Sequence, residues 1–586
     1  MKAWESLVLD YPDDTHAAAW YVYQLWHDRN EVPLQSYATV DALLEKILAR
    51  EPLHPAHHYR IHLWDEKRPK NALDAAAKCG PAAPNIAHMW HMPGHIYTKL
   101  KRFDDAAYHQ EASARVDHRH MIEDGLMPYQ IHNYVHNNEW LVRNLQPLGR
   151  TADALRISKN LLEIPRHPKM NGGEKSSAMI LGRDRLWDVL TKNELWSELL
   201  ATSDAGYFAA SATDDAEEIR LRRYTCVAHA ALGHRESAQQ ELVRLEGLRS
   251  ALDAPVTKPA PPAGEKSAAC DAPVKKDKRE IERSKRKLDQ ALRHAKGEIA
   301  ALDGDHKGAL ELLAKVDDLP KTRLARAATA AADHDRAVKL AREASKNAEN
   351  EVVGRAELVA ALRAKGDLDE AKKEFAALRK AAAAADLSLP ALVRLTDFAK
   401  ECEYPTDWRL AKDQPKEIGE RPTLDSLGPL AWTPGHAADW SLLDHAGKSH
   451  ALSQDYAGKP VVVLFYLGFG CLHCAEQLNT FGPLAAEYRA AGIELVAIST
   501  DTPADLKKSL DNAKQDGGFP FPLLSDSEKA VFKKYRCYDD FDNRAMHGTI
   551  LIDARGRIRW QEIGPEPFTD AKFLLGEAQR LLKLPE

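Results

Sequence analysis

The sequence lacks long hydrophobic runs, because no stretch of eighteen consecutive apolar residues occurs in its 586 residues. A helix that spans a membrane needs about 20 such residues, so no membrane span is predicted. The first twelve residues also lack the hydrophobic core of a secretory signal peptide. We therefore expect a soluble chain whose localisation stays unknown: cytoplasmic, or exported if the N-terminus is truncated.

The chain also has no excess of positive charge, and it contains few cysteines. Lysine and arginine number 81 against 87 aspartates and glutamates, and the formal net charge is −6, so the chain has no electrostatic footprint for nucleic acid. Seven cysteines in a chain of this length do not form a disulfide framework. Four of them are scattered, and we expect plain thiols at Cys79, Cys226, Cys270 and Cys402. The length predicts three or more domains.

Residues 1–250 show a recurring helical pattern in which a short turn precedes a helix that carries an early alanine. Clear examples are residues 101–107, 148–155 and 232–238. A small residue at this position lets two helices approach closely. The examples recur roughly every 40–50 residues, a longer period than the 34 residues of tetratricopeptide repeats. We expect a His-rich helical repeat domain over this range.

Residues 251–278 are rich in proline, alanine and lysine and cannot build a core. We expect this linker to be disordered and to split the helical array. Helical repeats resume over residues 279–402, where Ala332–Ala337 and Lys365–Ala371 begin similar units about 34 residues apart. That period resembles tetratricopeptide repeats, which are stacked scaffolds whose concave face binds peptides or proteins. The resemblance implies an α-helical solenoid on which a protein partner docks.

Histidine is unusually dense between residues 54 and 136. Each of three sets shares one helical face by its spacing: His54, His58 and His62; His88, His91 and His95; His132 and His136. Because pairs at i, i+4 can chelate zinc or copper, the candidate metal ligands are His58, His62, His91, His95, His132 and His136. We favour the alternative that these side chains are structural or line a partner groove, since no H-E-x-x-H arrangement occurs. Residues 91–97 resemble a His-Met-Pro-x-His motif of uncharacterised bacterial tetratricopeptide proteins, and that resemblance implies no known chemistry.

The most informative stretch lies near the C-terminus. Val461–Tyr466 is an unbroken apolar run, which predicts a strand buried on both faces. Two glycines end it, Cys471 and Cys474 follow, and a helical pattern starts at Ala475. A thiol at the start of a helix meets free backbone N–H groups and the positive end of the helix dipole, which both favour the reactive thiolate. The spacing also lets the two sulfurs close into a disulfide.

Two other interpretations of this C-x-x-C are inert buried cysteines and half of a zinc site completed by His473 and Cys537. A four-ligand zinc site needs a second ligand pair, and no second C-x-x-C occurs in the sequence. The strand–C-x-x-C–helix context therefore favours redox chemistry. We expect Cys537 to be a buried thiol rather than a resolving one.

A proline-rich connector at residues 403–434 precedes a C-terminal region in which predicted strands and helices alternate. A β-hairpin over residues 439–453 comes first, followed by β-α-β-α, a strand, a helix, two strands and a last helix. This order predicts a thioredoxin-fold domain over residues 435–586. The expected fold class is therefore multidomain, an α-helical tetratricopeptide-like solenoid followed by a thioredoxin-fold α/β domain.

Residues 435–586 resemble the redoxin group, which comprises the alkyl hydroperoxide reductase / thiol-specific antioxidant family and its thioredoxin-like relatives. The matching segments are 439–444, 458–466, 496–501, 521–526 and 548–556. Compared with peroxiredoxins, residues 466–474 resemble a Tyr-Pro-x-x-x-Thr-x-x-Cys loop, which implies that Cys474 attacks peroxide. Cys471 then replaces the Thr of that family, Leu467 its Pro and His547 its activating Arg.

Compared with thioredoxin-like oxidoreductases, the resemblance implies that Cys471 attacks and Cys474 resolves. His547 stands where that family has a cis-proline, and His473 resembles the Cys-Pro-His-Cys of periplasmic disulfide oxidases. The C-x-x-C favours this second assignment, because in dithiol–disulfide exchange one sulfur forms a mixed disulfide and the other resolves it. We expect His547 on a loop facing the thiols, where an imidazole orients or stabilises the thiolate.

The sequence thus predicts a thiol-disulfide oxidoreductase or peroxiredoxin-like reductase whose repeats dock a protein partner. Its substrate is a disulfide or a hydroperoxide, and a thiol is its electron donor. Apart from the redox-active Cys471–Cys474 disulfide we expect no cofactor, and a metal at the histidines is left open. The alternative is a repeat scaffold whose redoxin domain has drifted and only binds partners. The missing Pro, Arg and cis-Pro favour that alternative, whereas the intact C-x-x-C favours the enzyme.

Overall fold

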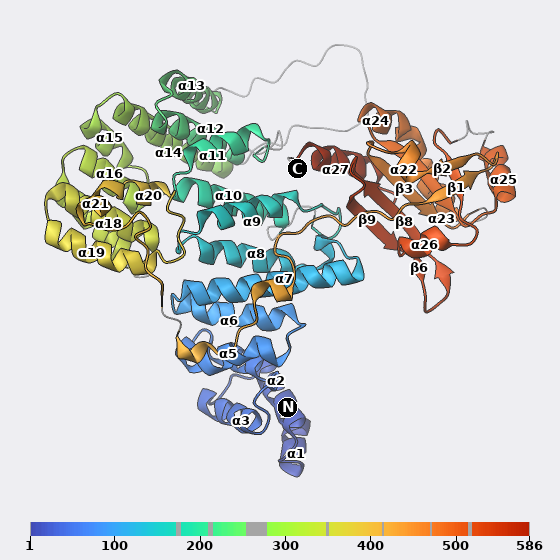
Figure 1. Cartoon of the computed structure of the whole chain (residues 1–586), viewed down its shortest axis with the longest axis horizontal. Coiled ribbons are helices and arrows are strands. Elements are labelled where there is room, and N and C mark those ends of the chain that lie inside the picture. The colour runs from blue at the N-terminus through green and yellow to red at the C-terminus, as the bar shows by residue number, and fades with distance from the viewer. Residues whose placement is uncertain are drawn as a thin grey trace.

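The computed structural model describes residues 2–171, 177–208, 215–252, 278–346, 351–412, 415–468, 472–513 and 519–584. The chain forms an array of helices, blue to yellow in Figure 1, with an orange and red α/β domain beside it. Within the described ranges, no helix has both the length and the apolarity that a membrane crossing requires.

The array begins with helices that stack from the N-terminus upward in the view of Figure 1. They are α1 (Lys2–Asp10), α2 (Thr15–His27), η1 (Asp28–Asn30), α3 (Tyr37–Arg50), α4 (His57–Trp64), η2 (Pro69–Ala72), α5 (Leu73–Ala82), α6 (Ala87–Lys99), α7 (Phe103–Asp124), η3 (Pro128–Gln130), α8 (His132–Leu145) and α9 (Thr151–Glu163).

The array continues with α10 (Ala178–Lys192), α11 (Trp196–Asp204), α12 (Asp215–Ala231), α13 (Arg235–Ala251), α14 (Lys278–Leu302), α15 (His306–Leu313), α16 (Lys321–Ala330), α17 (His334–Lys346), α18 (Val352–Lys365), α19 (Leu368–Ala381), α20 (Pro390–Val393) and α21 (Thr396–Glu401). Two short 3-10 helices, η4 (Lys416–Ile418) and η5 (Leu424–Leu427), follow in the connector.

Apolar residues at helical spacing hold neighbouring helices of the array together. In α9, Ala154, Ile157 and Leu161 are buried along one face. The starts of α2 and α3 are fixed by N-caps, since the side chains of Asp14 and Ser36 accept hydrogen bonds from backbone N–H groups inside each helix. A side-chain cap thus fixes where these two helices begin, and the apolar stripe of α9 packs on its neighbours.

The late helices of the array turn back and contact the loop that precedes α9. The backbone N–H of Val352, the first residue of α18, donates to the carbonyl of Pro147 over 2.9 Å. The backbone N–H of Asp386 donates to the carbonyl of Gly149 over 2.9 Å. Its carboxylate accepts from Thr151 Oγ1, also over 2.9 Å. These bonds tie the late helices of the array to its middle.

The sequence break at residues 251–278 does not split the array, contrary to our expectation. The flanking helices α13 and α14 pack with α12 in one core that includes Leu242, Leu245, Leu288 and Ala295. The apolar stripe of α14 needs a partner, and α12 and α13 supply it whatever the composition of the joining segment. The predicted disorder concerns residues that lie outside the described part of the chain.

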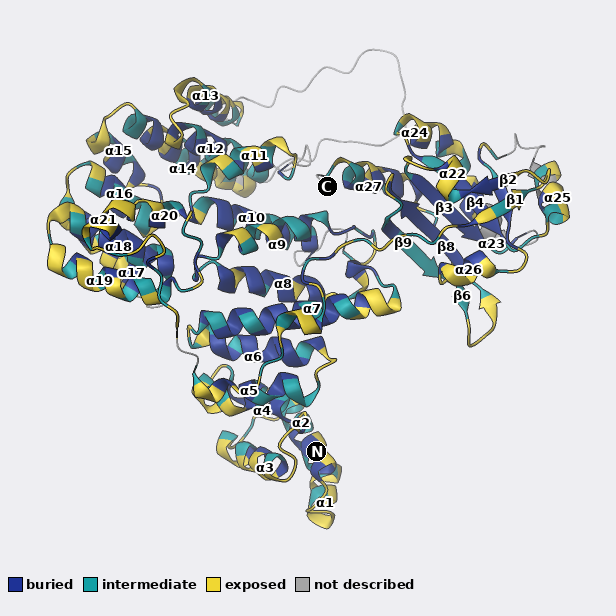
Figure 2. Cartoon of the chain, viewed as in Figure 1, coloured by how far each residue is buried: buried dark blue, intermediate teal, exposed yellow. Residues whose placement is uncertain are grey.

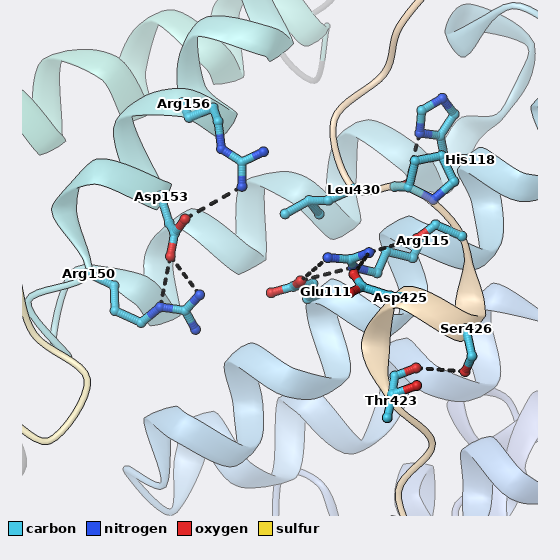
Figure 3. Close-up of polar contacts among 12 residues, drawn as sticks. Glu111, Arg115, His118, Arg150, Asp153, Arg156, Thr423, Asp425, Ser426 and Leu430 are labelled. Carbon is cyan, nitrogen blue, oxygen red and sulfur yellow. Dashed lines mark hydrogen bonds and ion pairs between the residues drawn. The ribbon is translucent and has the colours of Figure 1, made fainter.

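The connector, residues 403–434, lies along the array (Figure 1). Arg115 on α7 donates from Nη1 to Asp425 Oδ1 over 3.0 Å (Figure 3). His118, one turn further along α7, donates from Nδ1 to the carbonyl of Pro429 over 2.9 Å. The proline-rich segment is therefore fixed against one face of α7 until it enters the α/β domain.

The α/β domain is built on a mixed sheet in the order β2-β1-β5-β4-β3-β8-β9. Its strands are β1 (Ser441–Asp444), β2 (Ser449–Ala451), β3 (Val461–Tyr466), β4 (Glu494–Ser499), β5 (Leu523–Ser525), β8 (His547–Ile552) and β9 (Ile558–Gly564), with a separate hairpin of β6 (Tyr538–Asp539) and β7 (Arg544–Ala545). Its helices are α22 (Leu452–Asp455), α23 (Leu472–Phe481), η6 (Gly482–Leu484), α24 (Ala485–Ala490), α25 (Pro503–Ala513), α26 (Ala530–Lys534) and α27 (Ala571–Lys583). This is the thioredoxin-fold arrangement that the sequence predicts.

The central strand β3 is buried along its whole length, as predicted (Figure 2). It pairs parallel to β4 and antiparallel to β8. Because successive side chains point to opposite faces, Leu464 and Tyr466 pack in the core that includes Phe481 of α23. Phe465 packs on the other side in the core that includes Phe532 of α26. The two faces of the sheet therefore have separate cores.

The last strand of the sheet, β9, contacts the array directly. The Tyr129 hydroxyl, in the segment after α7, donates to the carbonyl of Gln561. The Gln561 side chain donates from Nε2 to the carbonyl of Gly125 over 2.6 Å. His167 Nε2 lies 2.7 Å from a carboxylate oxygen of Glu562. Successive residues of β9 are thus engaged by the array.

Buried side chains strengthen this junction. The fully buried Trp560 donates its indole N–H to the carbonyl of Arg166 over 2.7 Å. Arg580 on α27 donates to the carbonyls of Leu162 (2.8 Å) and Ile164 (2.9 Å) at the end of α9. Apolar residues of the array and of the α/β domain belong to one continuous core. The domain is therefore seated on the array rather than tethered to it.

Candidate functional site

The turn that leaves β3 is shaped by a glycine. Gly468 has φ +104°, in the region that favours glycine, and a Cβ there would overlap the carboxylate of Asp501. The preceding carbonyl, of Leu467, accepts a hydrogen bond from Thr500 Oγ1 over 2.7 Å. The end of β4 therefore fixes the path along which the chain enters the C-x-x-C segment.

The helix that follows is docked on the sheet by a buried polar bond. Gln477, in the middle of α23, donates from Nε2 to Thr549 Oγ1 on β8 over 3.0 Å. Leu478 and Phe481 add apolar contact with the same face of the sheet. The first turn of α23 consequently lies near the ends of β3 and β8 where these two strands pair.

The two predicted redox cysteines fall at this helix start. Cys474 belongs to the first turn of α23, and its side chain lies outside the described part of the structure. Cys471 precedes Leu472, the first residue of α23, and lies outside the described residues altogether. The strand and the helix predicted on either side of the motif are present, and the placement of Cys471 and the roles of the two thiols stay predictions.

His547 occupies a different environment from the predicted one. It is the first residue of β8 and only 3% exposed, whereas we expected a loop residue. Pairing extends to the start of the strand, because His547 lies opposite Gly564 and the next residue, Gly548, lies opposite Phe465. Its Nδ1 donates to the carbonyl of Pro565 over 2.8 Å. A solvated loop role is therefore excluded, and His547 lies beside the end of β3.

Cys537 lies on the other face of the sheet from α23. It is fully buried in the core that contains Phe465, and a Cβ added to Gly548 would overlap its sulfur. Burial raises the pKa of this thiol well above its ordinary value. The prediction of a buried thiol is confirmed, and Cys537 cannot meet a sulfur on α23 without opening the sheet.

The scattered cysteines that are described lie in surroundings that on balance disfavour the thiolate. Cys79 and Cys226 are buried, and Cys402 is half-buried. Desolvation raises the pKa of each thiol, to about 12 for Cys226. Cys270 lies outside the described residues. The high pKa values agree with the plain thiols predicted at the first three positions.

A second group of reactive side chains lies in the array, on the faces where α4, α6 and α8 meet. We call it the histidine band; its members are His58 and His62 on α4, His88, His91 and His95 on α6, and His136 on α8. It divides into two triads, each containing an i, i+4 pair from one helix and a third histidine from a neighbouring helix. Helix packing therefore supplies the third member of each group.

The first triad is His58, His62 and His88, whose nearest ring nitrogens all lie within 4.8 Å of one another. His58 Nε2 and His88 Nε2 are 3.1 Å apart. The second triad, His91, His95 and His136, meets the same limit. In it, the Nε2 atoms of His91 and His95 are 2.7 Å apart.

The two triads are adjacent because α6 contributes to both. The rings of His88 and His91 stack at a centroid distance of 5.9 Å. His88 shares the helical face that the sequence predicts, although it was not among the candidate ligands. His132 was a candidate, but among the described residues it joins neither triad; it is the exposed first residue of α8. His54 lies elsewhere, with His16 and Glu51.

Burial keeps the histidine band uncharged. Desolvation, together with a smaller effect of neighbouring imidazoles, lowers the pKa of His58 to about 3 and that of His91 to about 2. The same cause lowers the pKa of His62 and of His95 to about 4. Neutral imidazoles at physiological pH keep a ring-nitrogen lone pair available.

The α/β domain is the part of the chain that matches known proteins. Residues 434–561 match the AhpC/TSA family. Peroxiredoxin-4 of Dictyostelium discoideum is 32% identical over 132 residues, which cover 22% of this chain and 50% of that protein. The chain therefore spans about half the length of this relative. A peroxiredoxin of Mycobacterium tuberculosis (strain ATCC 25618 / H37Rv) is 30% identical over 135 residues, which cover 22% of this chain and 82% of that protein.

A similar solved structure is that of peroxidoxin BcpB from Mycobacterium tuberculosis. It is 24% identical, covers 26% of this chain and 97% of its own, and superposes with a TM-score of 0.23. The family assignment depends on the sequence comparisons and not on this superposition. The M. tuberculosis peroxiredoxin described above is 30% identical, and the match covers 82% of its length. Through its C-terminal domain, this chain belongs to the AhpC/TSA family.

Proposed function

We propose that the chain is a thiol-dependent oxidoreductase in which Cys471 and Cys474 form a redox-active dithiol. Cys471 is the attacking thiol and Cys474 resolves the intermediate. The observation that carries the proposal is the position of Cys474 in the first turn of α23, directly after the buried strand β3. There, unpaired backbone N–H groups and the helix dipole stabilise a thiolate.

The proposed exchange moves two electrons to a disulfide substrate. The Cys471 thiolate attacks one substrate sulfur, forms a mixed disulfide and expels the other sulfur as a thiolate. Cys474 then attacks the Cys471 sulfur, which releases the second substrate thiolate and leaves a Cys471–Cys474 disulfide. The expelled thiolates take up protons, and an external thiol donor returns the enzyme to the dithiol.

Peroxide reduction is the second candidate, and membership of the AhpC/TSA family favours it. In this case one thiolate attacks the O–O bond, becomes a sulfenic acid and releases water or an alcohol. The other thiol condenses with the sulfenic acid, releases water and closes the same disulfide. His547 lies beside the end of β3 and is proposed to position the reacting thiolate.

We extend the proposal to the array, which would dock the protein that carries the disulfide. A cavity of about 1040 Å³ lies among α10, α12 and α14, and its lining includes Trp187, Arg220, Arg223 and Asp318. Side chains of both charge signs beside an aromatic ring suit a polar peptide. The tetratricopeptide-like character of the helices is part of this proposal.

The experiment is turnover of the reduced full chain with insulin and, separately, with hydrogen peroxide, each with dithiothreitol as donor. Cys474→Ser should accumulate a mixed disulfide through Cys471, and Cys471→Ser should lose activity. Cys402→Ser, which removes a half-buried thiol far from the motif, should leave turnover unchanged. Absence of turnover in a folded, reduced protein would favour the drifted scaffold instead. If Cys471→Ser forms the trapped species and Cys474 forms sulfenic acid, the order of the two thiols is reversed.

A further inference from the structure

We propose that the histidine band is a binding site for divalent transition-metal ions, with one ion held by each histidine triad. The site is distinct from the C-x-x-C motif and lies on helices of the array. Its ligands are imidazole nitrogens alone. Zinc and copper are the ions whose chemistry fits such a set best.

The spacing of the ring nitrogens suits a shared ion. Metal–nitrogen bonds of about 2.0–2.1 Å in tetrahedral geometry place two ligand nitrogens roughly 3.3 Å apart. The 3.1 Å between His58 Nε2 and His88 Nε2 is close to this value. The 2.7 Å between His91 Nε2 and His95 Nε2 requires a small opening of one rotamer. The other ring-nitrogen pairs of each triad lie within 4.8 Å of one another.

A hydrogen bond between two imidazoles satisfies only two of the three ring nitrogens of a triad. A neutral imidazole has one N–H and one lone pair, so an Nε2–Nε2 contact uses the single N–H of one ring and the lone pair of the other. His91 is 2% exposed, and its Nδ1 has no hydrogen-bond partner among the described residues. A cation placed between the rings accepts all three lone pairs of a triad at once.

The surroundings of the band indicate which metal ions it suits. The nearby carboxylate of Asp65 pairs with Lys99 over 3.0 Å. Because the ligands are neutral nitrogens without a coordinating carboxylate, the site should select against Mg²⁺ and Ca²⁺, which prefer oxygen.

Three features make the band a built site with an entrance. The ligands come from α4, α6 and α8, and α6 packs against both other helices, so the backbone fixes the separation within each triad. Trp140 covers His95 at a centroid distance of 4.5 Å, and Arg143 covers Trp140. His136 is exposed and gives an ion access to the second triad. Three protein ligands leave one coordination position open.

A third group, His16, Glu51 and His54, is not part of the proposal. His16 and Glu51 are exposed, and Glu51 already accepts a hydrogen bond from Thr15. This group and the C-x-x-C thiols would obscure a metal titration. Both are therefore removed by making Cys471→Ser, Cys474→Ser and His16→Ala together as the background for the test. The result then does not depend on whether the proposed redox function is correct.

The test is a competition titration of the metal-free background protein with Zn²⁺ against a chromophoric chelator. We expect two equivalents to bind. His88→Ala should remove one equivalent, His136→Ala should remove the other, and the double variant should retain neither. Loss of a residue that only supports a metal ligand typically lowers metal affinity by at least about tenfold. Loss of a direct ligand should therefore lower the affinity of its triad by more than that. Co²⁺ should give visible absorption bands that disappear in the same variants.

The matched control is His306→Ala/His445→Ala, which removes two exposed histidines outside the band and should leave both equivalents. Far-UV circular dichroism of each metal-free variant establishes that the fold is kept. The proposal would be overturned if the background protein bound Zn²⁺ with the same affinity as the His88→Ala/His136→Ala variant. A single equivalent that either variant abolishes would overturn the assignment of one ion to each triad.

Discussion

The α/β domain places its candidate reactive residues next to one another in sequence, whereas the array brings its own together from three helices. Cys471 and Cys474 are separated by two residues, and one turn between a strand and a helix suffices to present them. The histidine band needs α4, α6 and α8 to stack before either triad exists. A local motif can therefore be recognised in a sequence, while a site made by packing becomes visible only in three dimensions.

Both regions bury titratable side chains, and the partners of these side chains differ. The buried carboxylate of Asp553 in the α/β domain pairs with Arg557 over 2.8 Å, whereas that of Asp117 on α7 of the array accepts from the neutral side chain of Asn137. Burial without charge pairing costs free energy, so Asp117 should make the stability of the array depend on pH. The predictions below test whether this contrast and the tight junction between the regions hold in solution.

The largest effect is expected at the junction. Trp560→Ala removes a fully buried indole that bonds the carbonyl of Arg166. We expect a loss of about 3–5 kcal/mol in the free energy of unfolding, the usual cost of truncating a buried aromatic residue. Urea unfolding followed by circular dichroism measures it. The control is Phe541→Ala, because Phe541 is 98% exposed on the same domain. An equal loss in both variants would contradict the seated arrangement.

The next effect concerns pH and the array. Burial raises the pKa of Asp117 to about 7, although its carboxylate accepts from Asn137 Nδ2 over 2.7 Å. Below pH 4 the Asp117 carboxyl is protonated in both the folded and the unfolded protein, so its ionisation does not lower the free energy of unfolding. Between pH 4 and pH 7 it ionises in the unfolded chain first, so stability falls as pH rises.

Asp117→Asn should remove this dependence and stabilise the chain at pH 7 by about 2–4 kcal/mol, since one pKa unit corresponds to about 1.4 kcal/mol. The measurement is the difference in unfolding free energy between variant and wild type from pH 4 to pH 8. That difference should grow until about pH 7 and then stay level. A difference that does not change with pH would show that Asp117 is already ionised in the folded protein.

The smallest effect on stability is expected at the turn after β3, where it should be accompanied by lost turnover. Gly468→Ala meets both a positive φ and the carboxylate of Asp501, and should cost about 1–3 kcal/mol. Gly458→Ala is the matched control, because Gly458 also has positive φ but no atom within 4 Å of an added Cβ. If both variants keep wild-type turnover, the path of this turn does not govern the redox site.

The elements that the sequence predicts well are those with a strong local signal. The buried strand over residues 461–466 is confirmed to the residue, because six consecutive apolar side chains can be accommodated only between two cores. The helix after the C-x-x-C also follows, since its apolar positions repeat at helical spacing. The small hairpin of β6 and β7 was not predicted, as two-residue strands carry almost no periodic signal.

The features that the sequence does not reveal depend on distant partners. His547 is buried because β8 pairs with strands on both sides, which its own neighbours in sequence do not indicate. The linker looked like a domain boundary by composition, yet the stripe on α14 packs against α12 and α13. His88 joins the first triad through His58, which lies on another helix, and the sequence around His88 does not indicate that contact.

The engagement of β9 by the array has a consequence for assembly. An unpaired outer strand is a template on which a second chain can add its own strand. At β9 that position is occupied by Gly125 and Tyr129 of the same molecule. The opposite margin of the sheet is β2, which is three residues long and offers little backbone to pair with. The sheet of this protein is consequently closed to growth at β9 and nearly so at β2, and a fragment cut at residue 434 would lose that protection.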